Sequence, residues 1–305
     1  MSNVAVLMST YNGQTYVREQ IDCILAQKDV NVQLFIRDDG SSDDTVSIVK
    51  EYTEKFPNVH LLQGPNLGVG SSFMDLVYHV KTDYDYYAFA DQDDNWLPEK
   101  ISSGVSKLKG EEGPVLYCSN QILVDKDKNR LGMRHKDALD CSWMQIMCNN
   151  KISGCTMVWN RALQAILYEP SRRPTPELLR IRIQDVWVGM VAASVGKVIY
   201  DENSYILYRQ HENNVVGVRE TSHLDEYKKK LKKKHLRRGR STLAYEVSSK
   251  YGDLLPQDTL TRLSKYGNYR RSLIRRFGMF KEKEIYRHTG ESAWAYRLKV
   301  LLGLF

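Results

Sequence analysis

The chain has 305 residues, 42% of them hydrophobic and 27% charged, so it fits a large globular domain with or without an appendage, and disordered, collagen-like and low-complexity chains are excluded. No apolar run approaches the roughly 18 residues of a membrane-spanning helix, the N-terminus lacks the basic segment of a secretory signal, and five cysteines without a CxxC pair favour a reducing cytosol over a disulfide framework or a zinc knuckle. The net charge of +7 is uneven: residues 218–305 carry +13 and residues 1–217 carry −6, so we place a domain boundary near Gly217.

Strands and helices alternate along the first 90 residues. Four short apolar runs predict buried strands, at residues 4–8, 32–36, 59–62 and 86–90. Three stretches between them predict helices, at residues 17–25, at residues 44–52, and from a serine cap at Ser71 or Ser72 through Val80. This alternation predicts an α/β fold with a mostly parallel sheet.

Polar loops follow these predicted strands. The loops at 9–13, 37–44 and 91–94 are rich in Asp, Asn, Gly or Ser. Because open α/β sheets bind ligands at the carboxyl ends of their strands, we expect these three loops to share one site.

The loop Asp91-Gln92-Asp93-Asp94 suggests a cation site. On an extended segment Asp91 and Asp93 point the same way, because side chains alternate along a strand. Their mutual repulsion would be relieved by Mg²⁺ or Mn²⁺, which prefer oxygen ligands. A solvated turn before the helix that follows Pro98 explains the motif equally well, so the motif alone does not decide.

The two other loops suggest nucleoside contacts. Asp39 could accept hydrogen bonds from a base or a ribose, and Tyr11 could pack on a nucleobase. The loop 9–13 lacks a GxGxxG pattern, which argues against a dinucleotide-binding dehydrogenase. Ordinary turns and helix caps remain the alternative for both loops.

Two single residues are further candidates. Asp185 lies in an otherwise apolar stretch, where a raised pKa would suit a general base. His211 could be a metal ligand through its neutral imidazole. A helix-capping Asp and a structural His are the alternatives.

In their order along the chain, these motifs resemble the family 2 glycosyltransferases, which have the GT-A fold. The resemblance covers about residues 1–217. It rests on the loops 9–13, 37–43 and 91–94, on Trp96, and on the segments Asn66-Leu67-Gly68, Gln184-Asp185 and Tyr208-Arg209-Gln210-His211. The Asp-Gln-Asp-Asp form and the last segment are similar to bacterial rhamnosyltransferases of cell-wall and capsular polysaccharide synthesis.

The resemblance implies a Rossmann-like α/β fold with a mixed, mostly parallel sheet flanked by helices. It implies a donor half at about residues 1–95 and an acceptor half at about 96–217. We expect residues 218–305 to form a basic helical segment.

The resemblance also implies roles for site residues. The nucleotide-sugar would be bound by Thr10, Tyr11, Asn12, Asp39, Asn66, Asp91 and Gln92. A Mg²⁺ or Mn²⁺ cofactor would be held by Asp93, Asp91 and His211. Asp185 would be the catalytic base, although Gln184 replaces the Glu that the family often has before it. The acceptor side would include Gly154, Cys155 and Trp187.

The implied reaction is an inverting single displacement of a nucleoside diphosphate. The expected donor is dTDP-L-rhamnose, with UDP-hexoses as the alternative, and the expected acceptor is a hydroxyl of a glycan or a polyprenol-linked sugar. A sugar-phosphate nucleotidyltransferase is disfavoured because the loop 9–13 has no basic residue. A nucleic-acid-binding protein is disfavoured by the acidic body, so no nucleic-acid partner is expected.

The C-terminal segment suggests a membrane surface as partner. Residues 228–240 hold nine Lys or Arg in 13 positions, which would attract anionic lipids unless the run is simply a solvated helix face. An apolar helical stripe further on would lie in the bilayer interface or pack on the catalytic domain; it consists of Trp294, Leu298, Leu301, Leu302 and Phe305. We therefore expect a cytoplasmic protein held at the inner face of the plasma membrane.

Overall fold

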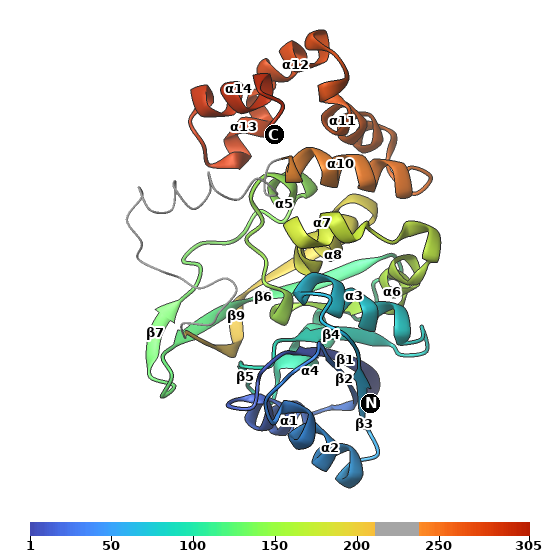
Figure 1. Cartoon of the computed structure of the whole chain (residues 1–305), viewed down its shortest axis with the longest axis vertical. Helices are drawn as coiled ribbons and strands as arrows, with labels where there is room; N and C mark the ends of the chain where they lie inside the picture. The colour runs from blue at the N-terminus through green and yellow to red at the C-terminus, as the bar shows by residue number, and fades with distance from the viewer. Residues whose placement is uncertain (211–237) are drawn as a thin grey trace.

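The computed structural model describes residues 1–210 and 238–305. Within them, one sheet has the strand order β3-β2-β1-β4-β8-β6-β9-β5, and β7 pairs with β6. The strands are β1 (Ser2–Thr10), β2 (Val30–Asp38), β3 (Val59–Gln63), β4 (Tyr86–Ala90), β5 (Asn95–Trp96), β6 (Val115–Val124), β7 (Arg130–Met133), β8 (Val158–Asn160) and β9 (Lys197–Arg209). Figure 1 shows this sheet running through the lower two thirds of the molecule.

The sheet is mixed and mostly parallel, as the sequence predicts. β1 pairs in parallel with β2 and β4, β2 with β3, and β6 with β9. β8 lies antiparallel between β4 and β6 and joins the two parallel parts. The carboxyl ends of β1, β2 and β4 therefore meet at one edge, where the polar loops follow.

Helices cover both faces of the sheet. In the catalytic part they are α1 (Val17–Leu25), α2 (Thr45–Lys55), α3 (Val69–His79), α4 (Lys100–Leu108), α5 (Trp143–Asn149), α6 (Arg161–Tyr168), α7 (Pro176–Ile181) and α8 (Gln184–Val195). Alternate residues of β1 point to opposite faces: Val4 and Val6 pack in the core with α1, α2 and α4, whereas Ala5 and Leu7 pack in the core with α3, α5, α6 and α8.

The predicted strands and all three helices are confirmed within a few residues, but the serine cap predicted for the third helix was wrong. α3 begins at Val69 after Gly68, whose φ of +81° suits glycine, so Ser71 and Ser72 lie inside the helix and do not cap it. The Ser72 hydroxyl instead hydrogen-bonds the Ser9 hydroxyl at 2.6 Å.

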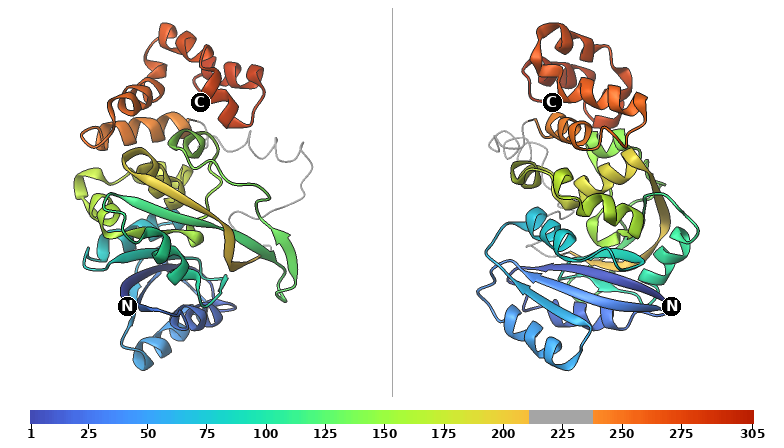
Figure 2. Two further views of the ribbon diagram at one scale, coloured as in Figure 1. Left: turned by 180° about the vertical axis from the view of Figure 1, so that it is seen from behind. Right: turned by 90° about the vertical axis from the view of Figure 1, so that its right-hand side faces the viewer.

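The residues from 239 onward form a helical lobe, which confirms the predicted helical C-terminal segment. It contains α10 (Gly239–Lys250), α11 (Gln257–Gly267), α12 (Leu273–Phe280), α13 (Lys283–Thr289) and α14 (Ala293–Leu301). All three ribbon views place this lobe at the end of the molecule opposite α1 and α2 (Figures 1 and 2). No helix in the described part of the chain is both long enough and apolar enough to cross a bilayer.

The helical lobe shares a hydrophobic core with the catalytic part. The Trp187 ring of α8 lies 5.9 Å from the Tyr251 ring that follows α10, and both side chains are fully buried. Arg172 forms an ion pair with Asp253 at 2.6 Å across the same contact. The domain boundary near Gly217 falls outside the described residues and stays a prediction.

The prediction of an apolar stripe of five residues was wrong for one of them. Phe305 is buried, and its ring lies 5.9 and 5.7 Å from the rings of Tyr269 and Tyr296. α14 ends at Leu301, so Phe305 does not continue the helical repeat and folds back into the lobe. The four other residues of the stripe are exposed.

We predict that Trp187→Ala lowers the free energy of unfolding by about 3–5 kcal/mol, the usual cost of removing a large buried side chain. Trp294→Ala is the matched control, because Trp294 is 73% exposed, and it should change this free energy by less than about 0.5 kcal/mol. Urea unfolding followed by circular dichroism measures both values. Equal losses in the two variants would contradict a core shared between the lobe and the catalytic part.

Candidate active site

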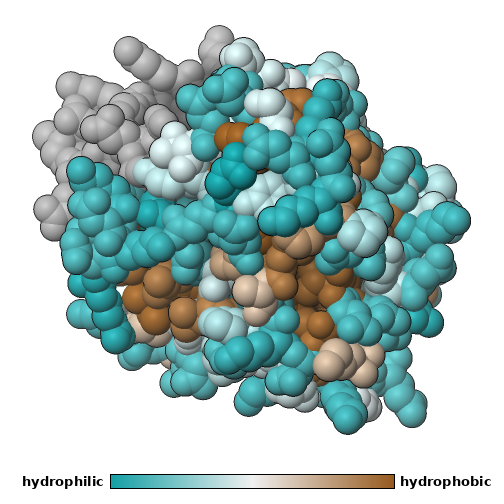
Figure 3. All heavy atoms as spheres, turned by 90° about the horizontal axis from the view of Figure 1, so that it is seen from below, coloured by the Kyte–Doolittle hydropathy of each residue, from teal (hydrophilic) through white to brown (hydrophobic). Residues whose placement is uncertain are grey.

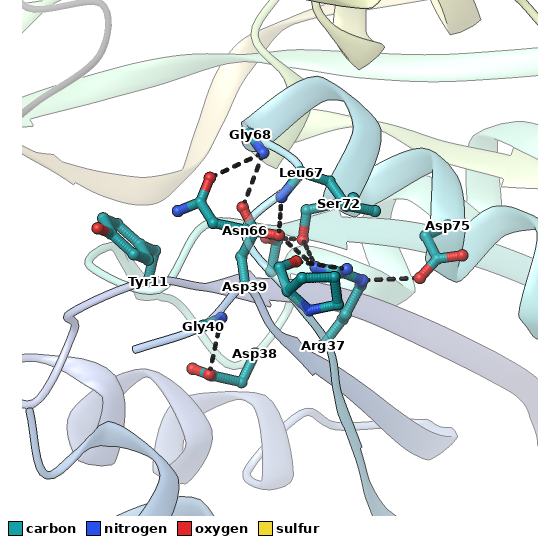
Figure 4. Close-up of polar contacts among 12 residues, drawn as sticks. Tyr11, Arg37, Asp38, Asp39, Gly40, Asn66, Leu67, Gly68, Ser72 and Asp75 are labelled. Atoms are coloured by element: carbon teal, nitrogen blue, oxygen red, sulfur yellow. Dashed lines mark hydrogen bonds and ion pairs between the residues drawn. The ribbon is translucent and has the colours of Figure 1, made fainter. Parts of the chain in front are cut away.

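The loop after β2 is held against the end of β1 by Asp38. The Thr10 hydroxyl donates to Asp38 Oδ1 at 3.1 Å, and the backbone N–H groups of Gly40 and Ser41 donate to Oδ2 at 3.1 and 2.8 Å. Figure 4 shows Asp38 turned toward Gly40 and away from Asp39. Asp38 and Thr10 thus fix the position at which Asp39 leaves the strand.

Asp39 joins the loop after β2 to the loop after β3. Its two oxygens accept hydrogen bonds from the backbone N–H groups of Leu67 and Gly68, at 2.8 and 2.9 Å. It also forms an ion pair with Arg37, which in turn donates to Asp75 at 2.7 Å (Figure 4). Both Asp39 oxygens therefore already accept hydrogen bonds within the protein. The nucleoside contact of Asp39 stays a prediction.

Tyr11 and Asn66 flank this buried network. The Tyr11 side chain is 49% exposed and lies on the same side of Asp39 as Asn66 (Figure 4). The Gln92 amide accepts from the Tyr11 backbone N–H at 2.8 Å and donates to its carbonyl at 3.1 Å. Asn12 Oδ1 accepts from the Ser42 N–H at 2.9 Å. Gln92 and Asn12 therefore orient the loop that carries Tyr11.

Carboxylates gather where β4 ends. One oxygen each of Asp91 and Asp94 and the sulfur of Cys155 lie within 4.8 Å of one another. Cys155 belongs to the short helix η1 (Gly154–Thr156), which precedes β8, the strand beside β4. The predicted metal set of Asp91, Asp93 and His211 shares Asp91 with this group, and it stays a prediction.

The carboxylates of this cluster repel one another. Burial and the negative charges of Asp93 and Asp185 together raise the pKa of Asp91 to about 7. The pKa of Asp94 is raised well above its usual range, by burial and by the charges of Asp91 and Asp93. A proton or a cation is needed to relieve this repulsion near neutral pH.

The donor set fits Mg²⁺ or Mn²⁺ better than zinc. Burial and the charges of Asp94 and Asp91 raise the pKa of the Cys155 thiol well above its usual range. The remaining donors are carboxylate oxygens, which hard cations prefer. Asp94 Oδ2 is buried and has no hydrogen-bond partner among the described residues.

A buried cation of the protein lies behind the cluster. Lys100 is 2% exposed, and its Nζ lies 3.7 Å from the centre of the Trp96 ring. Burial lowers the pKa of Lys100 to about 7, and the charges of Asp94 and Asp91 oppose this shift. The charge of Lys100 in turn opposes the upward shift of the Asp94 pKa.

Asp185 approaches the cluster from the first turn of α8. Its Oδ1 accepts from the Val186 N–H at 2.6 Å, and burial raises its pKa to about 6. A Cβ atom on Gly154 would lie 3.4 Å from the Asp185 Cβ, which places Gly154 next to Asp185. Gly154 and Cys155 thus lie beside Asp185 and Asp91, respectively.

Trp187 is buried in the core, and its acceptor-side role stays a prediction. Two residues along a helix turn the side chain by about 200°, so Trp187 points away from Asp185 and into the core against Tyr251. His211 lies outside the described residues, and its predicted role stays a prediction. Arg209 of the same motif donates to the Asp93 carbonyl at 3.2 Å and to Glu19 at 2.8 Å.

Arg134 is a functional candidate that the sequence reasoning missed. It follows β7, donates to Gln121 Oε1 at 2.9 Å, and lies 5.4 Å from the centre of the Tyr208 ring. Its positive charge lowers the pKa of both Asp91 and Asp185, so it faces the carboxylate cluster. A guanidinium here suits phosphate oxygens. A single Arg in a polar hairpin gives no sequence signal of this role.

We predict that Arg134→Ala raises the pKa of Asp185 above about 6, because a positive charge that favours the ionised form is removed. Arg134→Lys, which keeps the charge, should leave the pKa close to its original value. Carbon-13 NMR of protein labelled at aspartate carboxyl groups, assigned with Asp185→Asn, follows this titration. An unchanged pKa in Arg134→Ala would show that Arg134 does not act on the cluster.

The sequence matches the family model described as Glycosyl transferase family 2 over residues 5–165. It is 30% identical over 224 residues to the dTDP-rhamnosyl transferase RfbG of Shigella flexneri, covering 69% of this chain and 73% of that protein. An uncharacterized glycosyltransferase of Rickettsia typhi is 25% identical over 231 residues, covering 73% of this chain and 69% of that protein.

The fold is similar to that of solved glycosyltransferases. The crystal structure of S. aureus TarS in complex with UDP-GlcNAc has a TM-score of 0.59 and 14% sequence identity, and covers 99% of this chain and 82% of that chain. At this identity the likeness concerns the fold alone, and it identifies the sheet and its helices as a GT-A fold. The family match over more than half of the chain and the 30% identical relative show that this protein is an enzyme of glycosyl transferase family 2.

Proposed function

We propose that this enzyme moves a sugar from a nucleoside diphosphate to a hydroxyl group of a glycan or polyprenol-linked acceptor, with inversion at the anomeric carbon. The observation that carries this proposal is that Asp185 lies near enough to Asp91 for its charge to raise the Asp91 pKa, with Gly154 and Cys155 beside Asp185 and Asp91, respectively. A single carboxylate base opposite a phosphate-binding group is what a single displacement requires.

Asp185 is the proposed catalytic base. Its pKa of about 6 leaves it mostly ionised at neutral pH while keeping it basic enough to accept the proton of the acceptor hydroxyl. No second carboxylate nucleophile is needed, because the acceptor oxygen attacks the anomeric carbon directly. Gly154 and Cys155 leave the acceptor side of Asp185 lined by small side chains.

Asp93 and Asp91 are the proposed holders of Mg²⁺ or Mn²⁺, completed by His211. When bound, such a cation supplies Lewis-acid stabilisation of the negative charge on the leaving diphosphate. Arg209 hydrogen-bonds the Asp93 carbonyl, and Arg134 adds a positive charge that favours the ionised form of Asp91.

The proposed donor is dTDP-L-rhamnose, supported by the likeness to the dTDP-rhamnosyl transferase RfbG. A UDP-hexose is the alternative, since TarS was solved with UDP-GlcNAc. Both nucleotides carry a pyrimidine, which Thr10, Tyr11 and Asp39 would hold together with Asn66. The product would enter a bacterial cell-wall or capsular polysaccharide.

The proposed location is the cytoplasmic face of the plasma membrane, with residues 218–305 as the membrane-binding part. The net charge of +13 on this segment supports it, because each basic residue near an anionic surface contributes about 1 kcal/mol. A polyprenol-linked acceptor would be available at the same surface.

We predict that Asp93→Ala abolishes metal-dependent binding of the nucleotide, because the cation loses an anchoring carboxylate. Thermal stabilisation by dTDP, with and without Mn²⁺, measures this effect. Asp127→Ala is the matched control, because Asp127 is an exposed carboxylate on the β6–β7 turn, and it should bind as the wild type does. Binding of dTDP and Mn²⁺ by Asp93→Ala at wild-type strength would refute the metal assignment.

Asp185→Asn should keep the affinity for the nucleotide and lose transfer, because an amide cannot accept the proton. We expect transfer to fall about 10²–10⁴-fold, measured as nucleoside diphosphate released in the presence of acceptor. The wild-type rate should itself fall as the pH drops below about 6, where Asp185 becomes protonated. The control Glu177→Gln, which replaces an exposed residue of α7, should keep full activity. Weakened donor binding with unchanged turnover at saturation would make Asp185 a binding residue instead.

A further inference from the structure

α12 carries three large hydrophobic side chains that no described part of the chain covers. Leu273 is 65% exposed, Ile274 is 84% exposed and Phe277 is 56% exposed. They stand at positions i, i+1 and i+4, so they lie together on one side of the helix. Only Met279 of this helix is buried, and it holds α12 to the lobe.

α14 extends this exposed apolar surface. The two helices contact each other, and Arg276 Nη1 donates to the Leu301 carbonyl at 2.8 Å. Trp294 is 73% exposed and Leu302 is 59% exposed. We define the α12–α14 face by its exposed residues Leu273, Ile274, Phe277, Trp294, Leu298, Leu301 and Leu302. It lies at the outer end of the helical lobe (Figure 1).

Basic residues border the α12–α14 face. Arg270, Arg271 and Arg275 are exposed beside it, and the sequence has no acidic residue between Asp258 and Glu282. Aliphatic and aromatic side chains next to arginines are typical of helices that lie in the interface of an anionic bilayer. The apolar side chains enter the headgroup region while the guanidinium groups contact lipid phosphates.

We propose that the α12–α14 face is the surface by which the enzyme docks onto an anionic lipid bilayer. This inference rests on the proposed membrane location and makes it specific. Leu273, Ile274 and Phe277 make the apolar contact together with the exposed residues of α14. The guanidinium groups of Arg270, Arg271 and Arg275 contact the anionic headgroups.

The other end of the molecule does not offer the same combination. There, hydrophobic residues also gather within a mostly hydrophilic face (Figure 3). However, α1 and α2 mix both signs of charge: α1 has Arg18 with Glu19 and Asp22, and α2 has two lysines and two glutamates. That end therefore lacks the surplus of positive charge that attracts anionic lipid.

A second copy of the chain fits the α12–α14 face less well than a bilayer. A two-fold dimer through this face would bring the same patch of both copies together. The arginines around Ile274 and Phe277 would then face the arginines of the partner, and like charges in contact cost free energy. An anionic bilayer supplies both the apolar layer and the opposite charge.

The test is co-sedimentation of the full-length protein with vesicles of phosphatidylcholine, with or without about 30% phosphatidylglycerol. We expect the wild type to bind the anionic vesicles and to bind neutral vesicles more weakly. The double variant Ile274→Glu/Phe277→Glu should lose at least about tenfold in vesicle affinity, since two apolar side chains no longer leave water. Leu254→Glu is the matched control, because Leu254 is 40% exposed in the turn after α10, and it should bind as the wild type does.

A second variant separates charge from apolar contact. Arg271→Gln/Arg275→Gln should weaken binding by about fivefold for each arginine, and only on anionic vesicles. Unchanged thermal unfolding and unchanged dTDP binding in all variants show that they are folded. Vesicle binding does not depend on turnover, so its failure would leave the transferase assignment intact.

Four outcomes would overturn the proposal. The wild type would not bind anionic vesicles, or the Ile274→Glu/Phe277→Glu variant would bind them as strongly as the wild type. Binding would be lost only when Lys228, Lys229 and Lys230 are replaced by Gln, which would assign it to the basic run. Analytical ultracentrifugation would show a dimer that Ile274→Glu/Phe277→Glu dissociates, which would make the face a protein interface.

Discussion

Repulsion among the carboxylates at the end of β4 is the constraint on which the site depends. Asp91 has a pKa of about 7 because desolvation and the nearby charges of Asp93 and Asp185 disfavour its ionised form. Such an arrangement costs folding free energy, and the positive charges of Lys100 and Arg134 offset part of this cost. We propose that the same repulsion favours binding of a cation, which would in turn bind phosphate oxygens of a ligand.

The loops around this cluster are fixed by paired charges and backbone amides. Arg37 and Asp39 join the loops after β2 and β3, and Arg209 joins the Asp93 carbonyl to Glu19. The helical lobe continues the same structure, because the core behind α8 is closed by Tyr251. Because these loops are already ordered, ligand binding does not have to offset the entropy cost of ordering them.

Much of this could be predicted from the sequence, because short apolar runs mark strands and parallel strands bring their ends together. The strand ending at Ala90 and the aspartates after it are examples. The rest depends on contacts between distant residues. Asp94 lies beside Cys155, and Arg134 acts on Asp185, only once the chain is folded. No local sequence pattern predicts those positions.

The proposed transfer mechanism depends on a cation bound by the carboxylates of the loop after β4. Anomalous diffraction from crystals grown with dTDP and Mn²⁺ locates that ion directly. We predict a manganese peak about 2 Å from carboxylate oxygens of Asp91 and Asp93, with diphosphate oxygens of dTDP on the same ion. Bound dTDP with no manganese at these carboxylates, or manganese bound elsewhere in the molecule, would contradict it.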